Sequence, residues 1–229
     1  DKIGKNAKQV LSAQEKTATL FLLSDFEQSA IQYPSNISKL KTTKIKSKPK
    51  PRKHQTKAIN EVIKGFSKLD RGQLIMACGT GKTFTTLWIK EKLKPEVTLV
   101  LLPSLSLLSQ TLREWTFAGK TEFDVLCVCS DESVGKRDTD ETIASVQDVS
   151  FPTTSDSKVI ANFLKSKSEK VIFSTYQSSP AIAQAQKSKK LPNFDLVIAD
   201  EAHRCTGEVG SAFTTILDQT LIRANKRLF

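Results

Sequence analysis

A short glycine-rich run carries the residue types that hold a chain of phosphates: Gly79, Thr80, Gly81, Lys82 and Thr83. Glycines accept positive φ angles and let backbone N–H groups approach a polyanion closely, and a helix that begins after them adds a favourable dipole. Lys82 then reaches the β and γ oxygens of a nucleoside triphosphate, and the Thr83 hydroxyl is a ligand for Mg²⁺. By itself the run also fits an ordinary Gly-Lys turn, because Met76 stands where the general phosphate-loop pattern has glycine.

An acidic pair, Asp200 and Glu201, follows the apolar run 194–199, which has the composition of a strand buried on both faces. Two carboxyl groups at the end of such a strand are costly unless a cation lies opposite them, and a Mg²⁺ ion above the phosphate run meets this need. Asp200 then binds the metal through a water, and Glu201 is the base that activates the attacking water. The alternative is an acidic helix start, where both residue types are favoured anyway.

Together and in this order, the two motifs resemble those of the first RecA-like domain of superfamily two helicases and translocases. Residues 200–203 resemble the family's DEAH box, and residues 78–83 resemble its phosphate loop, in which Met76 is ordinary. The resemblance implies ATP and Mg²⁺ as cofactors. The catalytic residues that it implies are Lys82, Asp200 and Glu201. The metal ligands that it implies are Thr83 and Asp200, and the residue that couples hydrolysis to movement is His203.

The stretch 52–59 resembles the family's "RPYQ..AI" element, whose glutamine reads adenine. The resemblance implies Gln55 as an adenine ligand, through its paired amide donor and acceptor. Two positions depart from the pattern, since Lys53 replaces the usual proline and His54 stands where an aromatic residue often lies near the base. Without the resemblance, the stretch fits a basic helix start with a solvated glutamine. The implied nucleotide-binding residues are Arg52, Gln55, Cys78, Gly79, Thr80, Gly81, Lys82 and Thr83.

Two further stretches match where this family touches nucleic acid. Residues 97–110 resemble motif Ia, and residues 171–178 resemble the later S-T-Y-Q element. Small polar groups and backbone N–H groups at strand ends suit nucleic-acid phosphates, in contacts that carry no sequence information. Helix capping by Ser104 and Ser178 is the alternative. The implied nucleic-acid contacts are Pro103, Ser104, Gln110, Thr175, Tyr176 and Gln177.

Alternating apolar and helical stretches predict one α/β domain of the RecA-like type, with a parallel sheet covered by helices on both faces. Strands are predicted near residues 73–77, 97–102, 123–129, 170–174 and 194–199. Helices are predicted near residues 56–68, 82–94, 104–116, 157–167 and 178–189. The polar stretch 130–157 is interpreted as an exposed insertion.

The first part of the chain differs in composition. Residues 1–38 are interpreted as the end of an upstream domain or a helical extension, residues 39–53 as a basic linker, and residues 54–229 as the RecA-like domain. Residues 1–57 hold 13 Lys and Arg against 4 Asp and Glu, a net +9 of the chain's +11. The linker is either a solvated tether or a non-specific DNA contact. We expect the chain to stop before the family's motif III, as a fragment would.

Cysteine placement and the absence of targeting signals predict a cytoplasmic protein. Cys78 and Cys205 lie beside the two chemical motifs, which is poor placement for a disulfide framework, so reduced thiols are expected. Cys127 and Cys129 share a strand face and are interpreted as core residues rather than zinc ligands. No run approaches the roughly 18 apolar residues of a membrane span.

Within the family, the strings 74–83 and 200–207 are most similar to the motor parts of restriction-modification enzymes, in particular single-chain ones. The resemblance implies an ATP-binding motor domain of a DNA translocase, with duplex DNA as partner. It implies a second RecA-like domain, and nuclease and methyltransferase domains, in the full-length protein. The alternatives are an RNA helicase of the DEAH type, a P-loop NTPase without motor activity, and a binding module with a dead site.

Overall fold

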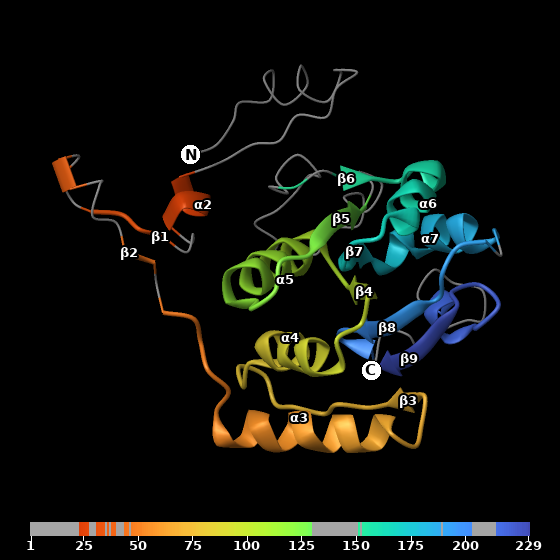
Figure 1. The fold of residues 1–229 in the computed structure, drawn as a ribbon, viewed down its shortest axis with the longest axis horizontal. Helices are drawn as coiled ribbons and strands as arrows, with labels where there is room; N and C mark the ends of the chain where they lie inside the picture. Colours follow the sequence, from red (N-terminus) through yellow and green to blue (C-terminus); the bar gives the residue numbers. More distant parts are fainter. Residues whose placement is uncertain are drawn as a thin grey trace.

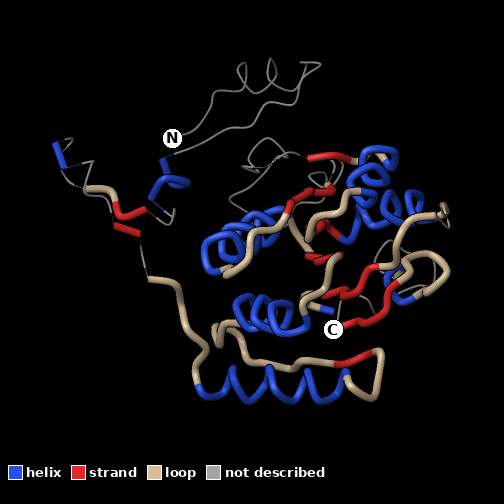
Figure 2. The backbone as a smooth tube through the Cα atoms, viewed as in Figure 1, coloured by secondary structure: helices blue, strands red, loops and turns tan. Residues whose placement is uncertain are grey.

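The computed structural model describes residues 23–27, 31–34, 36, 38–39, 44–45, 47–129, 151, 153–188, 190–202 and 214–229 of the 229-residue chain. Its main feature is a seven-stranded sheet with helices on both faces (Figure 1). This is the α/β, RecA-like fold that the alternating sequence pattern predicts, and Figure 2 shows the same division between strands, helices and loops.

Every neighbouring pair of strands in the large sheet is parallel, and the strand order is β3-β9-β8-β4-β7-β5-β6. The strands are β3 (Arg71–Gly72), β4 (Val97–Leu102), β5 (Asp124–Val128), β6 (Thr153–Thr154), β7 (Lys170–Thr175), β8 (Phe194–Ala199) and β9 (Ala224–Leu228). Because all strands run the same way, their carboxyl ends lie along one edge, which is where ligands bind to sheets of this kind.

Five longer helices cover the sheet: α3 (Lys53–Phe66), α4 (Lys82–Leu93), α5 (Leu105–Ala118), α6 (Ser157–Lys165) and α7 (Ser179–Gln186). Alternate residues of β4 point to opposite faces and join different cores. Val100 and Leu102 pack with side chains of α3, α4 and α5, whereas Leu99 and Leu101 pack with those of α6 and α7. The central strand is therefore buried on both sides, as its uninterrupted apolar run predicts.

Short polar side chains begin two of these helices. The Ser104 Oγ accepts a hydrogen bond from the Leu107 N–H at 3.3 Å, and Asp156 caps α6 through the Lys158 N–H at 2.7 Å. Ser104 thus fills the capping role that was the alternative to nucleic-acid contact. Gly81 occupies the position before α4, in a left-handed conformation.

The strand predicted at residues 73–77 is shorter and earlier than expected. Regular pairing is limited to β3, followed by one hydrogen bond from the Leu74 N–H to the Phe229 oxygen at 2.7 Å. The segment that leads from there to α4 is irregular (Figure 2), and Ile75 within it is 92 % exposed.

Two strands of the large sheet were not predicted. β9 joins the sheet between β3 and β8, and β6 pairs with β5. β6 lies inside the stretch interpreted as an exposed insertion, and the neighbouring Phe151 packs against the core of α3, α4 and α5. This end of the stretch therefore belongs to the domain, while residues 130–150 and 152 lie outside the described residues.

Before α3 the structure describes one short helix, α2 (Leu23–Glu27), and an antiparallel pair of two-residue strands, β1 (Ile31–Gln32) and β2 (Lys44–Ile45). β2 falls in the stretch interpreted as a linker. Within the described parts of the chain, no helix has the length and apolar character needed to span a bilayer. Cys78, Cys127 and Cys129 are free thiols, and burial beside Cys129 raises the pKa of the Cys127 thiol.

Candidate active site

The loop before α4 depends on two glycines with positive φ. Gly79 has φ +73° and Gly81 has φ +83°, in the left-handed region that favours glycine. A Cβ at Gly81 would lie 2.5 Å from the Gln55 Nε2, whereas a Cβ at Gly79 would meet no atom within 4 Å. The positive φ favours glycine at both positions, and at Gly81 the side chain of Gln55 also leaves no room for a Cβ.

The first turn of α4 presents Lys82 and Thr83 directly after this loop. No acidic residue lies in that turn, so no carboxylate of the turn neutralises the positive end of the helix dipole. The Thr85 side chain turns back and donates to the Gly81 oxygen at 2.9 Å, which holds the loop against the helix. The N–H groups of the first turn are thus available for an anion.

The acidic pair lies opposite Lys82. The Lys82 Nζ contacts the Glu201 Oε1 at 2.7 Å, and this bond raises the pKa of Lys82. Asp200 follows β8, and burial raises the pKa of its carboxyl group. Glu201 has φ +51°, an unfavourable angle for a residue with a Cβ. The two motifs, 119 residues apart in sequence, therefore meet at the carboxyl edge of the sheet.

A cavity of about 540 Å³ contains this contact. Its polar end is formed by Lys82, Thr86, Asp200 and Glu201, and its apolar wall includes Ile75 and Phe229. Among the described residues, no three His, Cys, Asp or Glu side chains gather to hold a metal. Two carboxyl groups, Asp200 and Glu201, line the cavity, and one or two carboxylates together with substrate phosphates are a common way of holding Mg²⁺.

Gln55 is only 4 % exposed and bonds the loop rather than solvent. Its Nε2 donates to the Thr80 oxygen at 3.0 Å and approaches the Gly81 oxygen at 3.4 Å, and its Oε1 accepts from the Arg52 N–H at 2.8 Å. His54 Nε2 also lies 3.3 Å from the Thr80 oxygen. The amide that was assigned to adenine is thus engaged on both sides by the chain itself, and it fixes α3 to the phosphate loop.

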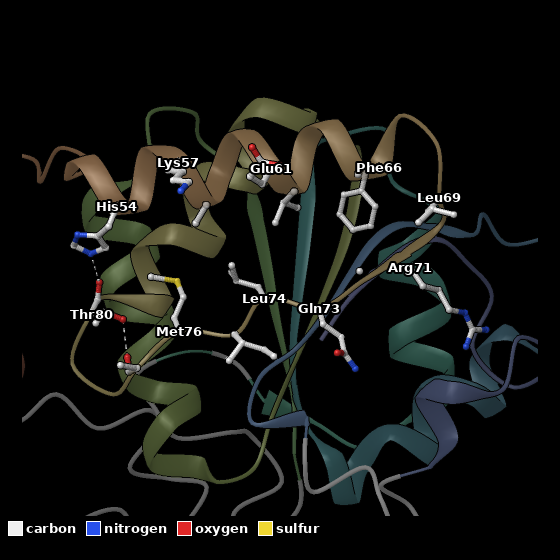
Figure 3. A pocket seen from close by; sticks show the side chains of 16 residues that line it. His54, Lys57, Glu61, Phe66, Leu69, Arg71, Gln73, Leu74, Met76 and Thr80 are labelled. Carbon is white, nitrogen blue, oxygen red and sulfur yellow. Dashed lines mark hydrogen bonds between the residues drawn. The ribbon is translucent and has the colours of Figure 1, made fainter.

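A second cavity, of about 650 Å³, separates α3 from residues 71–77 (Figure 3). Phe66 points from α3 into it, Leu69 lies beside Arg71 at one end, and His54, Met76 and Thr80 lie toward the other end beside the phosphate loop. It shares residues 73–76 with the first cavity, so this irregular segment forms a wall of both.

The two stretches assigned to nucleic acid lie side by side, because β4 and β7 are neighbours with Leu102 opposite Thr175. Gln110 and Gln177 are exposed, and Gln110 bonds Glu114 at 2.8 Å. Thr175 and Tyr176 are fully buried, so their side chains are not surface contacts in this conformation, and Pro103 is buried as well. Only part of the assigned set therefore reaches the surface.

Two hydrogen bonds that sequence reasoning missed reach the nucleotide motifs, one from Tyr176 in the second stretch and one from Trp115, which lies on α5 beyond the first stretch. The Tyr176 hydroxyl donates to the Asp200 main-chain oxygen at 2.7 Å, and the Trp115 indole donates to the Thr83 main-chain oxygen at 3.0 Å. Every residue carries a main-chain oxygen, so the sequence does not indicate which carbonyl group accepts these two hydrogen bonds. His203, assigned to coupling, lies outside the described residues.

Comparison with known proteins agrees with this geometry. Residues 48–228 match the family described as "Type III restriction enzyme, res subunit". A probable helicase of African swine fever virus, from a Malawi tick isolate, is 31 % identical over 157 residues, which cover 69 % of this chain and 16 % of the viral protein. The homologue from a Kenyan pig isolate is 31 % identical over 159 residues, with the same two coverages.

Two solved structures are also similar. The Type ISP restriction-modification enzyme LlaBIII bound to DNA matches with TM-score 0.85 and 34 % identity, over 98 % of this chain and 15 % of that one. A nuclease-deletion mutant of the Type ISP enzyme LlaGI, in complex with a DNA substrate mimic, matches with TM-score 0.62 and 38 % identity, over 79 % and 17 %. The chain spans about one sixth of the length of these relatives. It belongs to the family of the Type III restriction enzyme res subunit and is a helicase motor domain with a RecA-like fold.

Proposed function

We propose that this chain binds ATP and Mg²⁺ and hydrolyses ATP as the first motor domain of a duplex-DNA translocase in a restriction-modification enzyme. The observation that carries the proposal is the contact of 2.7 Å between Lys82 and Glu201 at the carboxyl edge of the parallel sheet. A P-loop lysine paired with a strand-end glutamate, beside a free helix N-terminus, suits phosphoryl transfer to water.

The loop residues would hold the triphosphate. The N–H groups that follow Gly79 and Gly81 would donate to phosphate oxygens at the start of α4, and Lys82 would reach the terminal oxygens. Mg²⁺, when bound, neutralises charge on the β and γ phosphate oxygens. The Thr83 hydroxyl and the Asp200 carboxyl group would hold it, and a cation there removes the cost of burying the Asp200 charge.

Glu201 would be the general base. In the structure its carboxylate pairs with the Lys82 ammonium group. A γ-phosphate competes for the same ammonium group, and once Lys82 turns to it, Glu201 is released to accept a proton from the attacking water. Because Lys82 pairs with either Glu201 or the γ-phosphate, Glu201 would act as a base only when a triphosphate occupies the site.

Duplex DNA is the proposed track. The LlaBIII structure is of an enzyme bound to DNA, and the LlaGI structure holds a DNA substrate mimic. In this chain, Gln110 on α5 and Gln177 in the turn after β7 are exposed, and these two elements follow the adjacent strands β4 and β7. Amide side chains at such positions suit phosphate oxygens, so the contact would follow the backbone without reading the sequence.

The proposal is tested by measuring ATP binding and the rate of ATP hydrolysis in the full-length protein that contains this chain. Glu201→Gln should retain ATP binding and lose hydrolysis by about 10²-fold to 10⁴-fold, because the base is removed while Lys82 remains. Lys82→Ala should lose binding as well. Lys92→Ala, an exposed lysine on the same helix, is the matched control and should keep wild-type hydrolysis.

Hydrolysis should rise with duplex DNA and not with RNA, and wild-type protein should displace a third strand from a triplex in an ATP-dependent way. Stimulation by RNA alone would favour an RNA helicase instead. Hydrolysis that responds to neither, with no strand displacement, would contradict a motor and indicate a nucleotide switch.

A further inference from the structure

Tyr176 links the acidic pair to the surface turn that follows β7. It begins the 3₁₀ turn η4 (Tyr176–Ser178), directly after β7, and its side chain is fully buried. Its hydroxyl donates to the Asp200 main-chain oxygen at 2.7 Å. Since β4 lies between β7 and β8, this side chain crosses the end of the central strand to reach Asp200.

The bonded oxygen belongs to the peptide unit that joins Asp200 to Glu201. The N–H of Glu201 lies in the same plane, so rotation of this peptide changes the direction in which the Glu201 side chain leaves the backbone. Glu201 has φ +51°, which L residues with a Cβ adopt only when their surroundings hold them there. The Asp200 N–H is held by the Leu101 oxygen at 2.9 Å, and the Tyr176 hydroxyl holds the following carbonyl.

The same turn carries an exposed side chain on its other side. Gln177 is exposed while its neighbours Tyr176 and Ser178 are buried, and the Thr175 hydroxyl donates to the Ser178 Oγ at 3.1 Å. This bond closes the turn, because it joins the last residue of β7 to the last residue of η4. A displacement of Gln177 would therefore reach the neighbouring Tyr176 ring, which is packed without solvent around it.

We propose that Tyr176 is a positioning residue that transmits nucleic-acid contact at Gln177 to the general base Glu201. The inference rests on the proposed function. Contact of Gln177 with a phosphate backbone shifts η4, the tyrosine hydroxyl carries the shift to the Asp200–Glu201 peptide, and Glu201 leaves Lys82 for the attacking water. Nucleic acid thereby accelerates hydrolysis without touching the nucleotide.

Tyr176→Phe tests this in the full-length protein, because it removes one hydroxyl and leaves the buried ring in place. ATP hydrolysis is measured with and without duplex DNA, together with the KM for ATP and the thermal unfolding midpoint. The ratio of DNA-stimulated to unstimulated kcat should fall about tenfold, the change that corresponds to one hydrogen bond of ~1.4 kcal/mol. The KM for ATP should stay within about twofold, because the phosphate loop is untouched.

The matched control is Tyr33→Phe. Tyr33 is the other tyrosine of the chain and is 46 % exposed, so its variant should keep the wild-type ratio. An unchanged ratio in Tyr176→Phe would overturn the inference. So would an equal fall of both rates with a lower thermal midpoint, since that is the result of a merely structural side chain.

Glu201→Gln in the same assay separates this inference from the proposed function. If wild-type protein is stimulated by DNA and Glu201→Gln is inactive, a normal ratio in Tyr176→Phe overturns the inference alone. If wild-type protein shows no stimulation, the proposed function fails and the inference fails with it.

Discussion

The indole N–H of Trp115 donates a hydrogen bond to the main-chain oxygen of Thr83 at 3.0 Å. Trp115 lies on α5, is fully buried, and packs edge-on against Phe173 of β7 with ring centroids 5.5 Å apart. The helix that begins at Ser104 is thus fixed to the first turn of the phosphate-loop helix. Together with the Tyr176–Asp200 bond, it connects the elements that follow β4 and β7 to the backbone of the two proposed metal ligands.

Trp115→Phe should weaken ATP binding, because the first turn of α4 loses its support and a cavity forms beneath it. We expect the Kd for a non-hydrolysable ATP analogue to rise about tenfold, equivalent to one buried hydrogen bond of ~1.4 kcal/mol, with a lower thermal midpoint. Trp88→Phe is the control, since Trp88 lies on α4 and stacks on Phe84 at 5.9 Å. Equal effects of the two variants on Kd would show that lost volume, rather than the bond to Thr83, is responsible.

Alanine at the two loop glycines should have unequal effects. Gly79→Ala introduces only the strain of a positive φ, about 1–2 kcal/mol, and should weaken nucleotide binding about tenfold. Gly81→Ala adds a clash with Gln55 at 2.5 Å and should abolish binding at millimolar ATP. Isothermal titration calorimetry measures both. Gly65→Ala, in α3 with open space around it, should leave binding unchanged, and equal losses in the two loop variants would refute the role of the clash.

Lys82→Ala should cost little stability although it removes nucleotide binding. Both partners of the Lys82–Glu201 pair are partly exposed, at 28 % and 32 %, so solvent screening limits the pair to about 0–1 kcal/mol. The folded-state pKa of Lys82 lies above 10.5, so this contribution is present below pH 10.5 and is lost as pH rises through the folded value. Thermal unfolding at pH 7 and above pH 10.5 checks this, and a loss of many degrees at pH 7 would be inconsistent with a screened pair.

The central strands could be predicted because a strand buried on both faces needs a run of mainly apolar residues, and 97–102 and 194–199 are both apolar apart from Thr98 and Asp195. β9 lacks such a run, since it contains Lys226 and Arg227. Arg227 is nevertheless buried, and its guanidinium donates to the main-chain oxygens of Ile216, Ala224 and Ile222. The hydrogen bonds that satisfy this buried charge depend on the tertiary structure. The alternation of apolar and polar residues within a strand therefore could not predict β9.

The phosphate loop and the acidic pair could be predicted as a unit because both follow apolar runs, and parallel strands bring their carboxyl ends together. Gln55 illustrates the limit of such reasoning. Its residue type matches a family position, but its side-chain amide bonds the main-chain oxygens of Thr80 and Gly81. The hydrogen-bond partner of an amide depends on the tertiary structure and cannot be read from the residue type.

The position of β4 also bears on mechanics. It is paired in register with β7 over all six of its residues and with β8 over four. The proposed DNA contacts after β7 and the acidic pair after β8 lie on either side of β4 at the carboxyl edge of the sheet, so a force between them acts across the strands. Both ladders join β4 along its length, and the ends of β7 and β8 therefore cannot move apart without breaking several parallel-strand hydrogen bonds together. The sheet would pass a displacement at one strand end to the other with little deformation of its own.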